Sequence, residues 1–193
     1  MDVWEAILTR RSIRRFQNRE VPEVLLEKLA EAARFYPCAA NLQPLRFFLT
    51  ADPALCGGLF ECVHWAGYLP GYRMEKEQQP KAYLVIFGDR TVSERFEFAA
   101  GAAAAELLLA IHAEGLAGCC LGLSQKERAA ELCGTDPKRY EPLYLLAMGY
   151  PLQEARVTED SGTCRYTMDE NGNMIVPKRA RKDILLEPVQ KEL

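Results

Sequence analysis

Apolar residues recur along much of the chain at intervals of three or four positions, which places them on one face of a helix. Near the start, Val3, Trp4, Ile7 and Leu8 share one side of a helix that Asp2 can cap and that runs to about residue 11. The same pattern continues in other parts of the sequence. It predicts helices over 2–11, 22–35, 54–63, the alanine-rich segment after Ser93, and 125–133.

Four shorter runs carry the apolar pattern of strands, at 45–50, 82–89, 116–122 and 143–151. The run AYLVIFGD, at 82–89, is apolar at nearly every position, which is typical of a strand buried on both faces. Two further short runs, within 165–176, flank an Asn-Gly dipeptide that favours a tight hairpin turn. The predicted helices and strands together indicate a sheet packed against helices. The segments between them, such as 12–19, are expected to be extended or irregular.

Composition narrows the class of protein. A chain of 193 residues with a net charge of -3 suggests one domain, spanning 1–193. The acidic balance argues against a general nucleic-acid surface, and the longest apolar segment, at 99–115, is shorter than the roughly 20 residues that cross a bilayer. We therefore expect neither nucleic acid nor membrane as a partner. Seven cysteines without a regular framework, behind an N-terminus unlike a secretory signal, favour a cytoplasmic protein.

Positive charge is nevertheless concentrated at the end of the first helix, where five arginines occupy positions between 10 and 19. A solvated helix end would explain them, since cations are favourable near a helix C-terminus. The cluster also suits a small anion, because guanidinium groups bind phosphate through paired hydrogen bonds. The sequence has no glycine-rich phosphate loop, so a bound phosphate would depend on these side chains.

The residues give no sign of a metal site or of a catalytic nucleophile. Cys56, Cys62 and His64 lie close in sequence, but their spacing matches no zinc pattern. The only other histidine, His112, has no accompanying nucleophile motif. We expect structural roles for both histidines and no bound metal.

Four segments, read together and in order, resemble the FMN-dependent nitroreductase family, in particular a branch with small chains. The first, RRSIRRF at 10–16, is similar to the start of family members, where basic side chains and a serine hold the flavin phosphate. The matching positions in this sequence are Arg10, Arg11, Ser12 and Arg14.

The other segments follow along the chain. PCAANLQPLRF, at 37–47, resembles the small-residue loop of the family, with Leu45 in place of the usual tryptophan. GLAGCCLG, at 115–122, is similar to the strand end that faces the flavin ring, and DENGNMIVPKR, at 169–179, looks like a hairpin whose basic pair returns to the phosphate. The flavin-binding positions that these segments imply are Pro37, Cys38, Ala39, Asn41, Gln43, Cys119, Leu121, Gly122, Lys178 and Arg179.

The resemblance implies an α+β fold, with a central mixed or antiparallel sheet flanked by helices, in an intertwined homodimer. Small residues in the long helix would permit close helix approach in such a dimer: Gly101, Ala102, Ala105 and Ala110. In the family the small-residue loop reaches the flavin of the other subunit. Asn41 and Arg10 of one flavin site are therefore expected to come from different chains.

The resemblance also implies a function, with FMN as cofactor and NADH or NADPH as hydride donor. Hydride would pass through FMN to a nitroaromatic, a quinone or a similar acceptor in a ping-pong scheme. Because the flavin performs the transfer, no catalytic side chain is required. A flavin-binding protein for storage or sensing, with little turnover, is the main alternative, and a flavin-consuming or dehalogenating enzyme is a third.

The aromatic stretch at 64–72 lies in the region that covers the substrate pocket in such proteins. Trp65 and Tyr68 could offer stacking surface to planar acceptors, and nearby glycines and a proline favour an adaptable loop. The alternative is that both side chains are core residues that complete the preceding helix. The two interpretations differ in whether substitution damages acceptor reduction or stability.

Overall fold

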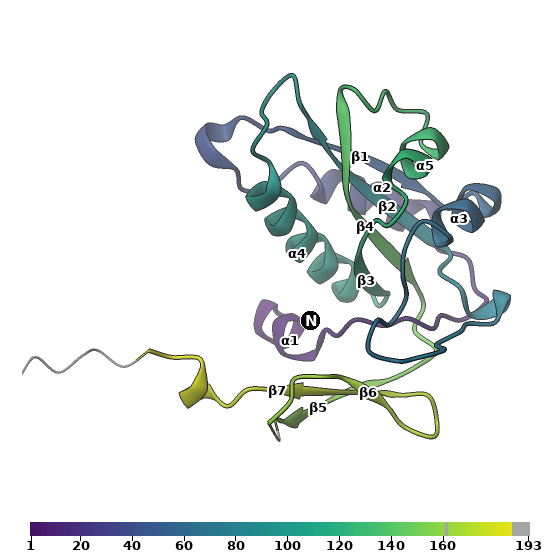
Figure 1. Cartoon of the computed structure of the whole chain (residues 1–193), viewed down its shortest axis with the longest axis vertical. Helices are drawn as coiled ribbons and strands as arrows, with labels where there is room; N and C mark the ends of the chain where they lie inside the picture. Colours follow the sequence, from purple (N-terminus) through teal and green to yellow (C-terminus); the bar gives the residue numbers. More distant parts are fainter. Residues whose placement is uncertain (161, 187–193) are drawn as a thin grey trace, which may run out of the picture.

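A computed structural model describes residues 1–160 and 162–186 of the chain. Its centre is a four-stranded antiparallel sheet with the strand order β1-β2-β4-β3 (Figure 1). The strands are β1 (Leu45–Thr50), β2 (Ala82–Asp89), β3 (Ala117–Gly122) and β4 (Tyr140–Gly149). The sequence predicted all four, two of them with the observed bounds. Every residue of β2 is buried, which confirms a strand covered on both faces.

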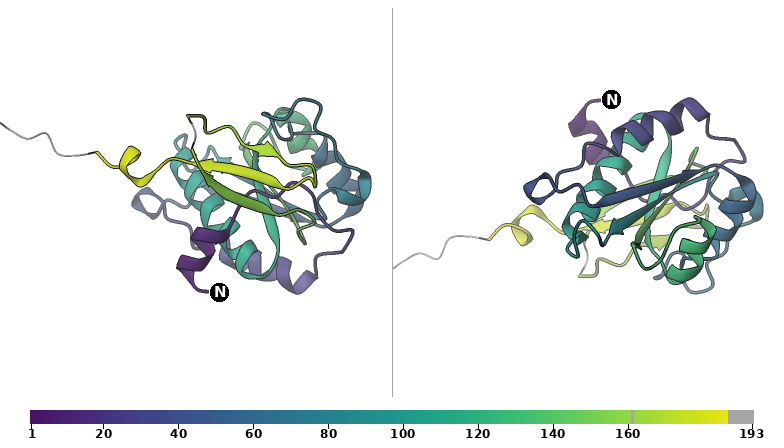
Figure 2. Two further views of the ribbon diagram at one scale, coloured as in Figure 1. Left: turned by 90° about the horizontal axis from the view of Figure 1, so that it is seen from below. Right: turned by 90° about the horizontal axis from the view of Figure 1, so that it is seen from above.

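Helices cover both faces of this sheet (Figures 1 and 2). On one face, α2 (Glu23–Ala32) and α4 (Glu97–Ala113) pack against Leu84 and Ile86 of β2. On the other face, α3 (Pro53–Phe60) and α5 (Lys126–Leu132) pack near Val85 and Phe87. Successive residues of β2 thus enter opposite cores, as the two-residue period of a strand requires.

The five predicted helices are confirmed, including α1 (Val3–Thr9), and most end earlier than the apolar pattern suggested. Asp2 caps α1 by accepting a hydrogen bond from the backbone of Glu5 at 2.8 Å. Asp52 caps α3 in the same way, accepting from Ala54 and Leu55 at 3.0 and 2.9 Å. Three short 3₁₀ helices lie at Ala39–Asn41, Lys76–Gln78 and Arg181–Asp183.

A second, smaller sheet lies against the arginine-rich end of α1 and has the order β5-β7-β6 (Figure 2, left). The predicted hairpin is confirmed: β6 (Thr167–Met168) pairs antiparallel with β7 (Met174–Lys178). Gly172 in its turn has a φ of 82°, a conformation that glycine adopts readily. No pattern in the sequence predicted β5 (Ala155–Glu159), which runs parallel to β7.

Candidate functional site

The arginine segment, residues 10–16, leaves α1 and runs along the free edge of β3. Ser12 forms a parallel bridge with Gly118, and the backbone N–H of Ile13 donates to the carbonyl of Gly118 at 3.3 Å. Further along, Phe16 bridges Pro151 in antiparallel fashion. The predicted extended conformation is therefore confirmed. The segment pairs with backbone groups at the otherwise unpaired edge of β3. The backbone positions of its arginines are therefore fixed.

Gln153 joins this segment to the hairpin. Its side chain is buried, and its Oε1 accepts from the backbone N–H of Arg14 at 2.7 Å and of Arg15 at 3.2 Å. Its Nε2 donates to the carbonyl of Gly172 at 2.7 Å. Both ends of the amide are thus satisfied, as burial requires. No pattern in the sequence distinguished this glutamine, which positions the backbone beside two of the arginines.

The side chains of the arginines in residues 10–15 meet no carboxylate among the described residues. Arg10, Arg11, Arg14 and Arg15 each hold a buried nitrogen that meets no hydrogen-bond acceptor in residues 1–160 and 162–186. None of the four forms an ion pair with a carboxylate of that described part. Burial and the charge of Arg10 lower the pKa of Arg11. A partly buried guanidinium whose buried nitrogen has no acceptor is costly, so this arrangement fits an anion bound between the side chains.

Arg11 also contacts the C-terminal end of α1, as expected if the arginines stabilise a helix end. Its guanidinium donates to the carbonyl of Leu8 at 2.8 Å and to that of Arg10, next to the last turn of α1. Its Nε nevertheless stays without an acceptor among the described residues. Helix capping therefore accounts for part of this side chain, while Arg10, Arg14 and Arg15 make no such contact within the described chain.

An aromatic surface lies beside the arginines. The guanidinium of Arg14 lies 4.7 Å from the centre of the Tyr166 ring, and that ring lies 5.1 Å from the ring of Tyr68. Arg15 lies 5.6 Å from the centre of the Tyr72 ring, whose buried hydroxyl has no partner in the described residues. Burial raises the pKa of Tyr72 despite the nearby arginines, so this hydroxyl stays a hydrogen-bond donor. Tyr72 belongs to the aromatic stretch expected to cover the pocket, whereas the sequence did not assign Arg15 or Tyr166 to named positions of the site.

The small-residue loop, residues 37–44, lies elsewhere in the protomer. The N–H of Asp89 donates to the carbonyl of Pro44 at 2.7 Å, which places the loop beside the start of α4. The arginine segment lies beside the other end of α4, where Thr9 Oγ1 and His112 Nε2 are 2.8 Å apart (Figure 1). An α-helix of 17 residues spans about 25 Å. Within the single chain, the two groups of predicted flavin residues are therefore not brought together.

A sequence model of the nitroreductase family matches residues 7–150, about three quarters of the chain. The chain belongs to the nitroreductase family. Over 159 residues it is 32% identical to a proposed NADH dehydrogenase/NAD(P)H nitroreductase of Methanothermobacter thermautotrophicus, covering 79% of each chain. It is 30% identical over 183 residues to an NADH dehydrogenase of Thermus thermophilus, covering 80% of this chain and 89% of that one.

The structure of this chain also resembles solved structures of nitroreductases. A proposed nitroreductase from Desulfovibrio desulfuricans, crystallised in complex with FMN, superposes with a TM-score of 0.72. It is 28% identical, and the match covers 97% of both chains. The expected α+β fold of this family is therefore confirmed.

The remaining predicted flavin residues lie on β3, at the last position of β7 and directly after it. Cys119 and Leu121 are buried in the core beneath α3 and α5, whereas Gly122 is exposed. Burial raises the pKa of the Cys119 thiol, so it stays protonated although Arg14 is near. Lys178 and Arg179 are exposed, and the Nε of Arg179 contacts the Sγ of Cys164 at 3.4 Å. Their predicted role at the phosphate remains a prediction.

Trp65 and Tyr68 have different surroundings in this nitroreductase. The Trp65 ring stacks on Phe60, with ring centres 5.2 Å apart, and its Nε1 donates to the carbonyl of Phe60 at 3.3 Å. Tyr68 is 54% exposed, and its backbone N–H donates to the hydroxyl of Tyr166 at 3.4 Å. The placement of Trp65 favours the packing alternative, whereas Tyr68 belongs to the aromatic surface beside Arg14.

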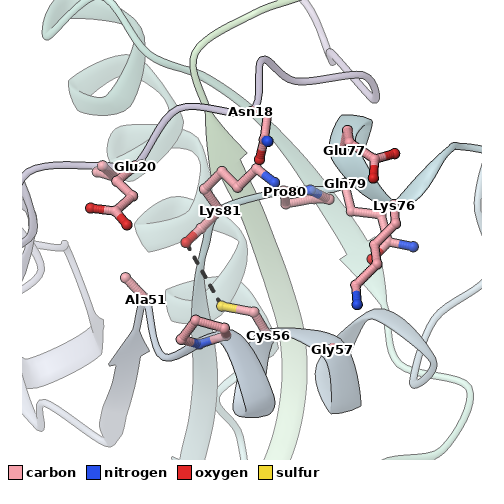
Figure 3. A pocket seen from close by; sticks show the side chains of 12 residues that line it. Asn18, Glu20, Ala51, Cys56, Gly57, Lys76, Glu77, Gln79, Pro80 and Lys81 are labelled. Atoms are coloured by element: carbon pink, nitrogen blue, oxygen red, sulfur yellow. Dashed lines mark hydrogen bonds between the residues drawn. The ribbon is translucent and has the colours of Figure 1, made fainter.

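A large groove of the described chain lies outside all of these residues (Figure 3). Its volume is about 640 Å³. Its wall carries side chains of both charges, among them Glu20, Glu77, Lys76 and Lys81, and no predicted flavin residue lines it. The one contact drawn there joins the Sγ of Cys56 to the carbonyl of Lys81 at 3.8 Å. This groove is therefore not where the predicted flavin residues lie.

No helix in the described part of the chain is long and apolar enough to cross a membrane. Within the same residues, no three His, Cys, Asp or Glu side chains are grouped to hold a metal ion.

Proposed function

We propose that this member of the nitroreductase family takes hydride from NADH or NADPH and reduces a small planar acceptor, a nitroaromatic or a quinone, by a ping-pong scheme. It is an FMN-dependent oxidoreductase. The observation that carries the assignment is the set of buried guanidinium nitrogens without an acceptor in the described chain, along the edge of β3. The names of the relatives support NADH or NADPH as the hydride donor. The structure from Desulfovibrio desulfuricans, crystallised with FMN, supports FMN as the cofactor.

The arginine segment suits the phosphate of FMN, which carries about two negative charges at neutral pH. Arg10 and Arg14 would donate charge-assisted hydrogen bonds to it, and Ser12 would add a hydroxyl. The backbone beside them is already fixed by Gln153, so little conformational freedom would be lost on binding. Bound FMN would supply the hydride transfer itself, and the protein would orient it and present the aromatic surface of Tyr68 and Tyr166 to the acceptor.

A homodimer would complete each site. The loop with Asn41 and Gln43 lies at the opposite end of α4 from the arginines, so a second chain must bring it near them. Apolar side chains that a second copy could cover are exposed on α1 and α4: Trp4 is 73% exposed, Leu8 64% and Phe98 75%. Exposed apolar patches of this kind mark interaction surfaces. The small exposed residues Gly101 and Ala105 of α4 would allow close helix approach.

The shared site can be tested by complementation. In a heterodimer of Asn41→Ala and Arg10→Ala chains, isolated through two different tags, we expect one site to keep both wild-type residues and the other to lose both. One FMN per dimer should then bind with wild-type affinity in a fluorescence titration. Two weakened sites and no intact one would show that both residues come from the same chain.

The oxidoreductase assignment can be tested by anaerobic mixing of the purified protein with NADH or NADPH. We expect at least one donor to bleach the flavin absorbance within about a second, as turnover numbers of ordinary enzymes require. Added quinone should then restore the absorbance. FMN, and no FAD, should be released on denaturation. A flavin that neither donor bleaches at such rates would instead support the storage or sensing alternative.

A further inference from the structure

The loop of residues 37–44 holds an uncommon backbone conformation. Ala40, Asn41 and Gln43 have φ values of 49°, 53° and 51°, in the left-handed region that residues with a Cβ normally avoid. Three such residues within four positions persist only when the surrounding structure holds them there. Such conformations are concentrated at ligand sites, so what holds this loop bears on the flavin site.

Arg46 is the side chain that makes the most contacts to the backbone of this region. It follows the loop, on β1, and its Nη1 donates to the carbonyl of Gln43 at 3.1 Å and to that of Leu45 at 2.8 Å. The only other side-chain contact to the left-handed residues within the described chain is weaker: the N–H of Gln43 donates to the Sγ of Cys38 at 3.2 Å.

Arg46 is in turn held by Asp89, at the end of the neighbouring strand β2. The carboxylate of Asp89 is fully buried, and its Oδ2 lies 3.3 Å from an Arg46 nitrogen. Arg139 fixes the carboxylate from the other side through bonds of 3.2 and 3.0 Å, and the hydroxyl of Thr91 adds one of 2.6 Å. The hydrogen bonds from Arg139, which have the largest effect, and those from Thr91 hold the pKa of Asp89 well below its usual range. The carboxylate is therefore negatively charged at ordinary pH.

We propose that Arg46, held by Asp89, is a positioning residue that fixes the loop of residues 37–44 in its flavin-binding conformation. This inference rests on the proposed flavin site. The side chains of Asn41 and Gln43 are exposed, and the bond to the Gln43 carbonyl sets the direction in which the loop presents them. A loop released from this bond would have to be ordered on binding, which weakens affinity.

The test compares Arg46→Met with Arg90→Met in the full-length protein. Arg90 is a matched control, because its side chain is 43% exposed against 47% for Arg46 and it also pairs with a carboxylate, that of Glu141. It too donates to a backbone carbonyl, at Pro137, but in a loop without predicted flavin residues. We expect Arg46→Met to weaken FMN binding about threefold to tenfold and to speed hydrogen exchange at residues 41–43, with Arg46→Lys recovering part of the affinity.

Several outcomes would overturn the inference. If Arg46→Met binds FMN as tightly as the wild type, or if Arg90→Met loses the same affinity, then Arg46 has no special role in positioning. Unchanged hydrogen exchange at the loop would overturn it as well. A wild-type protein that does not bind FMN would overturn the proposed function and this inference together, and so is distinguishable from the other results.

Discussion

Replacing Arg14 by alanine is expected to weaken FMN binding about tenfold to a hundredfold, because a charge-assisted hydrogen bond to a phosphate contributes about 1.5 to 3 kcal/mol. The fold should survive, since Gln153 bonds to the backbone of residue 14 and not to its side chain. A fluorescence titration of the apoprotein with FMN measures the affinity, and thermal unfolding of the same samples measures stability.

Arg19 provides the control for this experiment. It belongs to the same run of arginines, but its guanidinium lies over the Tyr150 ring, 3.6 Å from the ring centre. We expect Arg19→Ala to leave FMN affinity nearly unchanged. An equal loss of affinity in both variants would mean that general positive charge, and not a specific contact, attracts the cofactor. An unchanged affinity in Arg14→Ala would reject the phosphate site.

A second large effect is expected on stability. Trp65→Ala should lower the free energy of unfolding by about 3 kcal/mol, at the low end for a large aromatic side chain because Trp65 is only partly buried. It loses the stacking on Phe60 and one hydrogen bond. Chemical denaturation measures this loss. The rate of quinone reduction, normalised to folded protein, should stay near the wild-type value.

Tyr68→Ala is the counterpart, since this side chain is exposed and contacts Tyr166 and Arg165 rather than the core. It should leave the melting temperature unchanged and alter the rate of acceptor reduction. If Trp65→Ala instead keeps full stability and slows reduction, the sequence-based assignment of Trp65 to the substrate pocket is correct and its packing role is minor.

The helices and the four main strands could be predicted because local apolar spacing is enough to identify them. The strand β5 could not, since most of its side chains are exposed and it pairs in parallel with a strand nineteen positions later, Ala155 with Met174. The left-handed residues of the small-residue loop also escaped prediction. Ala40 and Gln43 are not residue types that normally signal such a conformation.

The site was predictable only in part. The arginine cluster was conspicuous in the sequence, and its lack of carboxylate partners among the described residues agrees with the expected anion. Gln153 and Tyr166 could not be found, because what distinguishes them is a contact with residues far away in the chain. Likewise, periodicity could not separate Trp65 from Tyr68, whose surroundings depend on tertiary packing.

The bonds of Gln153 also bear on the order in which the protein folds. They join the backbone of Arg14 to a side chain 139 positions later, and that side chain to the turn at Gly172. Contacts across so long a loop form late, because the entropy of closing it must be overcome first. During synthesis the arginines leave the ribosome early, yet their backbone partner follows only after most of the chain. A nascent chain stopped before residue 153 is therefore expected to leave the backbone of Arg14 and Arg15 without these bonds, even where its central sheet has folded.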